Sequence, residues 1–275
     1  MRGRTKLISV VTMLAILLSV SLVFASGILD VSKVSLLGAP GMMEPDSPGP
    51  TTVALNPIKT VKDWLKFPAY RTGNTFTVVV NTTDVADLYT WQINITWSNK
   101  TVLNVNRIIL GEFLATSPNS VSSEVLGFVI NSTSNANGYS ASSETLLSDP
   151  AGITGSGNLT KIQFSIINYG WTLLNISITG TLPTILLDST GATIAFSTVH
   201  ANIYVTSAAG YFSNRLLGDC DSNRKVVYAD FSILAGSYGS HMGQVTYKVQ
   251  ADFDYSGDVV YADFSALAGN YGKSV

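Results

Sequence analysis

Two stretches near the C-terminus carry oxygen-bearing side chains at the spacing of a cation-binding loop. In residues 219–230 these side chains occupy loop positions 1, 3, 5 and 12, and residues 252–263 repeat the arrangement. Such oxygens, with the backbone carbonyl of position 7, form the ligand set of a helix-flanked Ca²⁺ loop. Neither loop contains histidine and the whole chain has one cysteine, which argues against zinc. The sequence therefore predicts two Ca²⁺ ions, held by Asp219, Asp221, Asn223, Lys225 and Asp230 and by Asp252, Asp254, Ser256, Asp258 and Asp263.

The first loop departs from the usual pattern at position 6. This position needs a positive φ and is normally glycine. Gly257 satisfies it, whereas Arg224 should cost about 1 kcal/mol. We therefore expect the second loop to bind Ca²⁺ more tightly, and Arg224→Gly to strengthen the first. The alternative is a pair of Asp-rich surface turns without a ligand, and it does not account for two copies in register.

Each loop leads into a duplicated segment that must hold its last ligand. Residues 226–239 and 259–272 are identical at 12 of 14 positions. Apolar residues recur in both copies at i, i+3, i+4 and i+7, which predicts one helix per copy with a single apolar stripe. The stripes are Phe231, Leu234, Ala235 and Tyr238, and Phe264, Leu267, Ala268 and Tyr271. Each helix is expected to end at a glycine, and the valines at loop position 8 to join the two loops through a short β-bridge.

Residues 51–207 show the pattern of β-strands. Between residues 89 and 97 large apolar side chains alternate with polar ones, which predicts one buried and one solvated face. Further strands are expected at 75–80, 161–167, 173–179 and 201–206, separated by turns rich in Gly, Asn, Ser or Asp. We therefore predict a mainly β fold: an antiparallel jelly-roll sandwich followed by a small α-helical calcium-binding module.

The remaining segments indicate an exported chain. Residues 1–25 combine three basic residues with an apolar run and predict a signal peptide or, if uncleaved, an N-terminal membrane anchor. Residues 26–50 are rich in Gly and Pro and predict a linker, and a shorter linker is expected at 208–216, before the module of residues 217–275. Without the first 25 residues, 13 Lys and Arg stand against 18 Asp and Glu, a formal charge of −5. Nucleic acid is therefore not an expected partner.

Residues 217–275 resemble the dockerin module, because the duplicated loop is followed each time by a single helix and carries Val at position 8 and Asp at position 12. Residues 51–207 are similar to the cohesin module, on "GNTFTVVVNTTDVADLYTWQINITWSNKTVLNVNRIILGEFL" (73–114), "GSGNLTKIQFSII" and "TILLDSTGATIAFSTVHANIYVT". That family is a nine-stranded jelly roll that binds dockerins. The resemblance implies partners that carry cohesins or dockerins, including further copies of this chain.

In the dockerin family, loop positions 10 and 11 and the helix after them form the partner-reading surface. The resemblance places Tyr228, Ala229, Tyr261 and Ala262 there. Because these residues are repeated, it implies docking in two orientations related by a pseudo-twofold axis. The alternative is that the tyrosines simply pack in the core.

The sequence favours a connector over an enzyme. His200 and His241 are the only histidines, and neither lies in a recognisable nucleophile motif. The carboxylates of the β-block are scattered, so a pair placed for glycoside hydrolysis is not indicated. The predicted function is that of a secreted or cell-surface adaptor for calcium-dependent protein–protein assembly.

Carbohydrate binding is the alternative function, within a polysaccharide-degrading or surface-layer assembly. Trp64 and Trp171 are the candidates for a sugar platform, because Trp91 and Trp97 lie in phase with the buried face of their strand. The chain also has six Asn-x-Ser/Thr sequons that are candidates for glycosylation, at Asn81, Asn94, Asn99, Asn131, Asn158 and Asn175.

Overall fold

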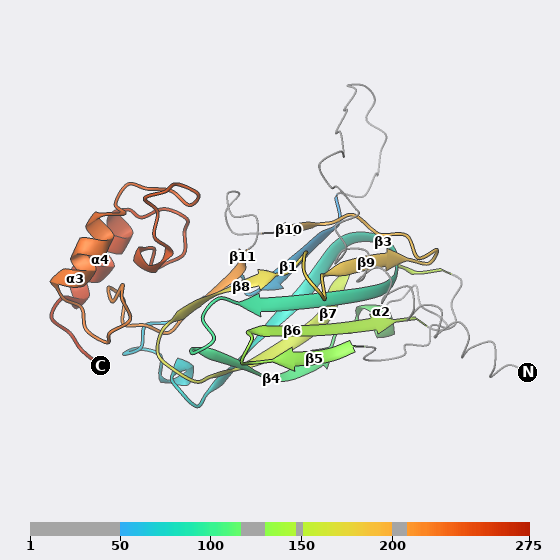
Figure 1. Cartoon of the computed structure of the whole chain (residues 1–275), viewed down its shortest axis with the longest axis horizontal. Helices are drawn as coiled ribbons and strands as arrows, with labels where there is room; N and C mark the ends of the chain where they lie inside the picture. The colour runs from blue at the N-terminus through green and yellow to red at the C-terminus, as the bar shows by residue number, and fades with distance from the viewer. Residues whose placement is uncertain (1–49, 117–129, 147–150, 200–207) are drawn as a thin grey trace, which may run out of the picture.

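The computed structural model of the chain describes residues 50–116, 130–146, 151–199 and 208–275 (Figure 1). The segment expected at 1–25, nearly all of the linker at 26–50 and the strand expected at 201–206 lie outside these ranges. No helix within the described ranges is long and apolar enough to cross a membrane. The described chain is mainly β, as predicted, and its two longest helices lie near the C-terminus.

The strands form two layers that share one long strand, β3 (Thr75–Trp97). The first half of β3 belongs to one layer, with β10 (Ser197–Val199), β1 (Thr52–Asn56), β7 (Ile153–Ile166) and β4 (Leu103–Leu110). The second half belongs to the other layer, with β5 (Ile130–Ser134), β6 (Tyr139–Thr145), β9 (Ile185–Asp188), β8 (Trp171–Ile176), β11 (Ala208–Ser213) and β2 (Lys59–Val61). Within the described ranges, β1–β10 and β11–β2 are the parallel pairs and the others are antiparallel. The predicted antiparallel sandwich is therefore confirmed in its main features.

β3 passes from one layer to the other in its middle. Its pairing with β7 shifts register between Thr82 and Leu88, and Asp84 and Asp87 adopt φ of 52° and 55° there. Irregularities of this kind bend a strand and increase its twist. The two expected strands at 75–80 and 89–97 are thus halves of a single element, which closes the sandwich on itself.

The main core lies between the two layers. Phe76 of the first layer stacks on Phe212 of the second with ring centroids 4.6 Å apart. Phe164 and Trp97 meet edge to face across the same space at 5.7 Å. Trp91 and Trp97 are buried, as predicted. Large aromatic side chains of this kind dominate the burial energy of a core.

The polar face expected along residues 89–97 is not solvated. Gln92 and Asn94 are 1% and 7% exposed. The side-chain amide of Gln92 donates to the carbonyl of Pro183 at 2.5 Å, and that of Asn94 to the carbonyl of Leu182 at 2.8 Å. The prediction of a wet face was wrong because a segment about 90 residues away in the chain covers it. A sugar on Asn94 is incompatible with this packing.

Helices α3 (Tyr228–Ala235) and α4 (Tyr261–Asn270) form where the repeat predicts them, side by side at one end of the sandwich (Figure 1). The predicted apolar stripe is buried only at one leucine of each helix, Leu234 or Leu267. The aromatic residues of the stripe stay at the surface. Short helical turns lie elsewhere, namely α2 (Phe113–Thr116) and the 3-10 turns Pro68–Tyr70 and Val249–Ala251.

The valines at loop position 8 do not pair with each other as expected. The carbonyl of Val226 accepts from the backbone N–H of Gly272, and the carbonyl of Val259 from that of Gly239, both at 2.8 Å. Each loop is therefore fastened to the end of the other copy's helix. Both glycines have a positive φ, 82° for Gly272 and 77° for Gly239. Gly272 directly follows the C-cap of α4, as expected, whereas α3 ends earlier than predicted, at Ala235 with Gly236 as its C-cap.

The prediction of a linker at 208–216 was also wrong. Residues 208–213 form β11, which pairs with β8 and β2, and Asn214, Arg215 and Leu216 are buried after it. The sandwich therefore continues to Ser213 and leads directly into the first loop. A six-residue strand with a weak alternation is recognised only through its neighbours, which the sequence pattern does not show.

Candidate metal centre and docking surface

The structure brings the acidic residues of each loop together. Ligand oxygens of Asp219, Asp221 and Asp230 all lie within 4.8 Å of one another, and the same holds for their counterparts Asp252, Asp254 and Asp263. Positions 1 and 12 are buried in both loops, and position 3 is exposed. The position 1 and position 12 carboxylates are thus fixed by packing, and the position 3 carboxylate is accessible to solvent.

The backbone of each loop holds the position 1 carboxylate in the same way. Oδ2 of Asp219 accepts from the N–H of Arg224, and Oδ2 of Asp252 from that of Gly257, each at 2.8 Å. These two position 6 residues have φ of 72° and 94°. The predicted left-handed conformation is therefore confirmed, including at the arginine, and it turns the backbone N–H inwards.

Position 12 ties the start of each helix to its loop. Asp230 accepts from the N–H of Cys220 and of Val227, both at 2.8 Å. Asp263 accepts from the matching N–H groups of Phe253 and Val260, at 2.7 and 2.9 Å. An aspartate at this position is therefore anchored to the backbone on both sides, which sets the distance from helix to loop.

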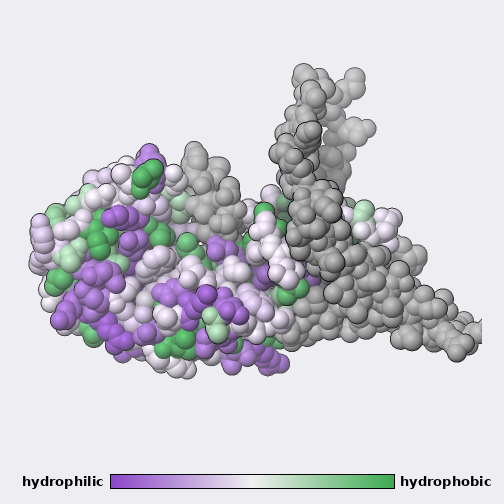
Figure 2. Space-filling view, viewed as in Figure 1, coloured by the Kyte–Doolittle hydropathy of each residue, from purple (hydrophilic) through white to green (hydrophobic). Residues whose placement is uncertain are grey.

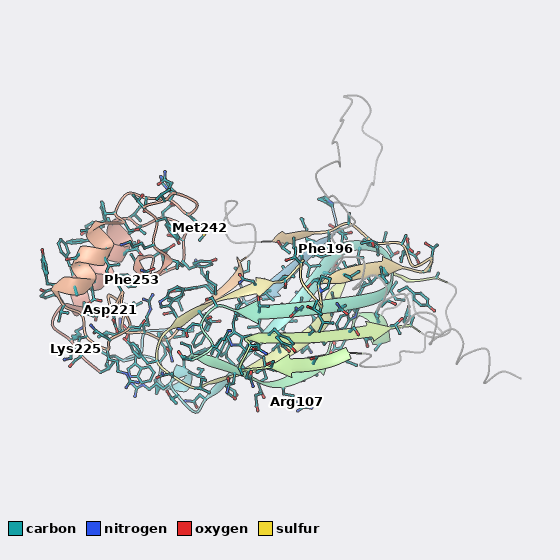
Figure 3. The ribbon with its side chains drawn as sticks, viewed as in Figure 1. Arg107, Phe196, Asp221, Lys225, Met242 and Phe253 are labelled. Atoms are coloured by element: carbon teal, nitrogen blue, oxygen red, sulfur yellow. The ribbon has the colours of Figure 1, made fainter. Side chains whose placement is uncertain are left out.

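The residues at loop positions 5 and 7 form different hydrogen bonds in the two loops. The Asn223 amide oxygen accepts from the N–H of Lys225 at 2.9 Å, and the Ser256 hydroxyl donates to the carbonyl of Asp258 at 3.1 Å. The Asp258 carboxylate turns away to His241. At position 7 of the second loop the carboxylate is therefore directed away from the cluster, and the backbone carbonyl, which accepts from Ser256, remains the expected ligand group. Asp221 and Lys225 lie on the module beside the helices (Figure 3).

The electrostatics of the clusters favour a bound cation. Burial raises the pKa of Asp252 to about 7 and raises the pKa values of Asp219 and Asp263. The ion pairs found within the described ranges do not include the six clustered carboxylates. Buried carboxylates without a counter-charge are costly, and a divalent cation removes that cost. The donor set, all oxygen, fits Ca²⁺.

The tyrosines of the repeat are at the surface. Tyr228 and Tyr261 are each 71% exposed, so the alternative that they pack in the core is excluded. The visible face of the module carries hydrophobic side chains scattered among hydrophilic ones (Figure 2). Ala229 and Ala262, which follow the two tyrosines in the sequence, are also exposed. The four residues expected to contact a partner are therefore accessible in both copies.

Three residues that the sequence analysis did not single out join the loops to their surroundings. The Tyr169 hydroxyl, in the turn between β7 and β8, donates to Asp219 Oδ2 at 2.6 Å, and the Tyr247 hydroxyl donates to Asp252 Oδ2 at 2.8 Å. Arg215 is 1% exposed and donates to the carbonyls of Asp219, Cys220 and Gln250 at 2.9, 3.3 and 3.1 Å. The Tyr169–Asp219 and Arg215–Gln250 contacts join residues 50 and 35 positions apart, so no local pattern marks them. The other contacts span only four or five residues.

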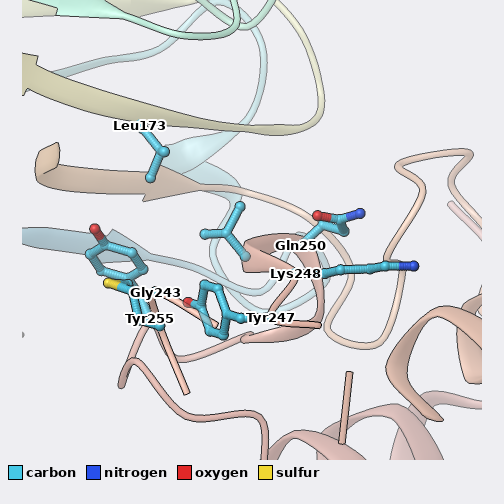
Figure 4. Close-up of a pocket in the computed structure, with 8 residues that line it drawn as sticks. Leu173, Gly243, Tyr247, Lys248, Gln250 and Tyr255 are labelled. Carbon is cyan, nitrogen blue, oxygen red and sulfur yellow. The ribbon is translucent and has the colours of Figure 1, made fainter. Parts of the chain in front are cut away.

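A pocket of ≈ 300 Å³ lies where the loop between the two repeats meets β8 (Figure 4). Leu173 lines it from the sandwich, and Tyr247, Val249 and Tyr255 line it from the module. Lys248 is its one charged lining residue. The pocket therefore lacks the paired acid and base groups that a hydrolytic site needs.

The tryptophans proposed as a sugar platform are engaged in packing. The Trp64 ring meets Tyr169 edge to face at 5.1 Å, and Trp171 lies 6.1 Å from Tyr211. The guanidinium of Arg215 lies 5.8 Å from the centroid of the Trp171 ring. Both indoles are half-buried and are held by these packing contacts. Of the sequons other than Asn94, Asn81, Asn99, Asn158 and Asn175 are half-buried, and the side chain of Asn131 lies outside the described residues.

No family model and no curated protein matches the chain. Among solved structures, it is similar to a non-cellulosomal cohesin of the archaeon Archaeoglobus fulgidus, with 14% identity and a TM-score of 0.38 over 60% of this chain and 90% of that one. It is also similar to a type II cohesin domain from the cellulosome of Acetivibrio cellulolyticus, with 13% identity and a TM-score of 0.41 over 56% of this chain and 93% of that one. TM-scores below 0.5 do not establish a shared fold, so the proposals below rest on the residues of this chain.

Proposed function

We propose that the chain is an exported, non-catalytic adaptor whose C-terminal module folds around two Ca²⁺ ions and docks onto a protein partner. The two oxygen clusters, each with an inward-turned backbone N–H at position 6, support the metal part of this proposal. The partner is a cohesin-bearing protein or a second copy of this chain, as the resemblance of residues 51–207 and 217–275 implies. Calcium would set the distance between each loop and the helix that carries the docking residues.

The proposal that the module docks onto a protein partner rests on two equivalent exposed aromatic faces, one on each copy of the repeat. In one copy the Tyr228 and Phe231 rings lie 6.1 Å apart at 36°, and in the other Tyr261 and Phe264 lie 6.3 Å apart at 37°. Both tyrosines are 71% exposed and both phenylalanines 36%. Exposed tyrosines are frequent anchors of protein interfaces. Because the two faces match in sequence and geometry, either can meet the same partner surface.

This equivalence predicts how binding responds to substitution. In Tyr228→Ala or Tyr261→Ala one face remains intact, so affinity should fall by about twofold, which corresponds to ~0.4 kcal/mol. The double variant loses both anchors and should bind at least about a hundredfold more weakly. The measurement is surface-immobilised chain, residues 51–275, titrated in Ca²⁺ with a panel of cohesin modules and with a second copy of itself.

Val245→Ala is the matched control, because Val245 is fully exposed on the loop between the repeats and lies outside both faces. It should bind as the unmutated chain does. Equal and severe loss in each single variant would show one composite face instead of two. Unchanged binding by the double variant, or binding to none of the cohesins and no second copy, would refute the docking proposal.

A further inference from the structure

In both loops a tyrosine hydroxyl donates to the position 1 aspartate, but the two tyrosines come from different parts of the chain. In each loop Oδ2 of the position 1 aspartate accepts one bond from the position 6 backbone and a second from a tyrosine hydroxyl. In the second loop this hydroxyl belongs to Tyr247, five residues before Asp252 and within the module. In the first loop it belongs to Tyr169, fifty residues before Asp219 and within the sandwich. The sandwich thus supplies to one loop what the module supplies to the other.

Tyr169 is held rigidly for this contact. Its side chain is 5% exposed, and its hydroxyl accepts from the N–H of Leu216 at 2.7 Å, so the hydroxyl proton is directed at Asp219. Trp64 packs on the ring edge to face, and the Arg224 guanidinium lies 5.5 Å from the ring centroid. A group fixed on several sides orients its hydrogen-bond partner without losing further side-chain freedom.

The turn that carries Tyr169 is itself anchored to the end of the sandwich. The Asn214 side chain accepts from the N–H of Gly170 at 2.9 Å and donates to the carbonyl of Tyr70 at 3.0 Å. Gly170 adopts φ of 147°, and a Cβ there would lie 2.8 Å from Val102. The backbone that carries the Tyr169 side chain is therefore anchored to the sandwich.

We propose that Tyr169 is a positioning residue for the first metal loop, so that the Ca²⁺ affinity of this loop, but not of the second, depends on contact with the sandwich. This inference rests on the proposed calcium function. Residues that orient a metal-binding carboxylate through a hydrogen bond typically change metal affinity by about 10–100-fold when removed. By linkage, Ca²⁺ in the first loop strengthens the attachment of the module to the sandwich by the same factor.

The test is calcium titration by isothermal calorimetry on the chain of residues 51–275, in backgrounds that each retain one loop. Asp252→Asn leaves the first loop to be measured, and Asp219→Asn leaves the second. Tyr169→Phe removes one oxygen and keeps the ring against Trp64. In the first background it should weaken Ca²⁺ binding about tenfold or more, and in the second it should change affinity by less than about twofold.

Tyr247→Phe is the matched control and should show the reverse pattern. Far-UV circular dichroism and tryptophan fluorescence of each variant establish that it is folded. Unchanged affinity of the first loop in Tyr169→Phe, or equal loss in both loops, would overturn the inference while leaving the adaptor proposal intact. An unmutated chain that binds no Ca²⁺ would refute the proposed function and this inference together.

Discussion

Arg224 occupies a position at which the loop pattern calls for glycine. Its φ of 72° carries the expected strain of about 1 kcal/mol. Its side chain, however, reaches the sandwich, where the guanidinium lies over Tyr169 and Nη2 is 3.3 Å from the Asn168 amide oxygen. A cation–π contact at a partly exposed site contributes about 0.5–1 kcal/mol. The contact therefore offsets most of the strain, which explains why an arginine is tolerated there.

The balance between backbone strain and side-chain contacts at Arg224 predicts the outcome of two substitutions. Arg224→Gly relieves the strain and loses the contacts, so the free energy of unfolding should change by less than about 0.5 kcal/mol. Arg224→Ala keeps the strain and loses the contacts, and should destabilise by about 1 kcal/mol. Urea unfolding in saturating Ca²⁺, followed by circular dichroism at 222 nm, measures both. A gain above about 1 kcal/mol in the glycine variant would show that the side chain contributes nothing.

Glu144 is a buried carboxyl in the sandwich, where the Trp91 indole N–H donates to its Oε2 at 3.0 Å. Burial raises its pKa from 4.5 to about 7, against the opposing effect of that hydrogen bond. Between these two values the folded chain holds a proton that the unfolded chain releases. The contribution of Glu144 to stability is therefore complete below about pH 4.5 and is lost as pH rises through about 7.

Glu144→Gln should remove this dependence, because the amide oxygen can still accept from Trp91 and has no proton to lose. Relative to the unmutated chain, the variant should gain about 1–3 kcal/mol in unfolding free energy at pH 8 and little at pH 4.5. Urea unfolding followed by tryptophan fluorescence at both pH values measures the difference. Glu112→Gln is the control, because Glu112 is an exposed partner of Lys161. An equal effect of Glu144→Gln at both pH values would contradict the assignment.

At the scale of elements, a structural feature could be predicted when the residues that form it are close in the sequence, and was missed when they are far apart in the sequence. The alternation of residues 89–97 predicts a strand because a strand's faces are set by neighbours two residues apart. The prediction that the polar face of this strand is solvated was wrong, since Leu182 and Pro183 cover Gln92 and Asn94 from another part of the chain. The joining of two expected strands into β3, and the strand β11 in place of a linker, likewise depend on partners in the sheet.

The two candidate metal loops show the same dependence on the distance between interacting residues. Their ligands fall within twelve residues, so spacing alone predicts the cluster that the structure assembles. The cross-contacts of Val226 and Val259 with the end of the opposite helix depend on how two copies pack, and the sequence-based prediction had them paired with each other. Tyr169 contacts the first loop from the sandwich, and Arg215 contacts it from the segment between the sandwich and the loop. Both residues lie outside the repeat, so the repeat does not mark them.

At the scale of the whole molecule, sandwich and module share packing yet keep separate cores. The sandwich core draws on both layers, whereas the module core is a smaller cluster around Val226, Leu234, Val259 and Leu267. Tyr169 of the sandwich belongs to the module's cluster, and Tyr211 of β11 stacks on Tyr255 of the second loop at 4.6 Å. The module is thus a small unit that packs on a larger one, and we expect its own core to be too small to offset the repulsion of its clustered aspartates without metal.

Removal of Ca²⁺ should therefore unfold the module and spare the sandwich. Circular dichroism at 222 nm reports mainly on α3 and α4, while all four tryptophans of the chain lie before residue 217. In chelator the helical signal should be lost, and the buried Trp91 and Trp97 should keep their emission. Trp64 should become more accessible to acrylamide, because the Tyr169 turn and the first loop no longer pack together.

The double variant Asp219→Asn with Asp252→Asn should behave in Ca²⁺ as the unmutated chain does in chelator, because each substitution removes the buried first ligand of its loop. Asp84→Asn, a change of the same chemistry at an exposed position in β3, is the control and should leave both signals unchanged. Full helical signal in chelator would refute the dependence of the module on metal. Simultaneous loss of helical signal and core tryptophan emission would show that sandwich and module unfold as one cooperative unit, contrary to the separation of their cores.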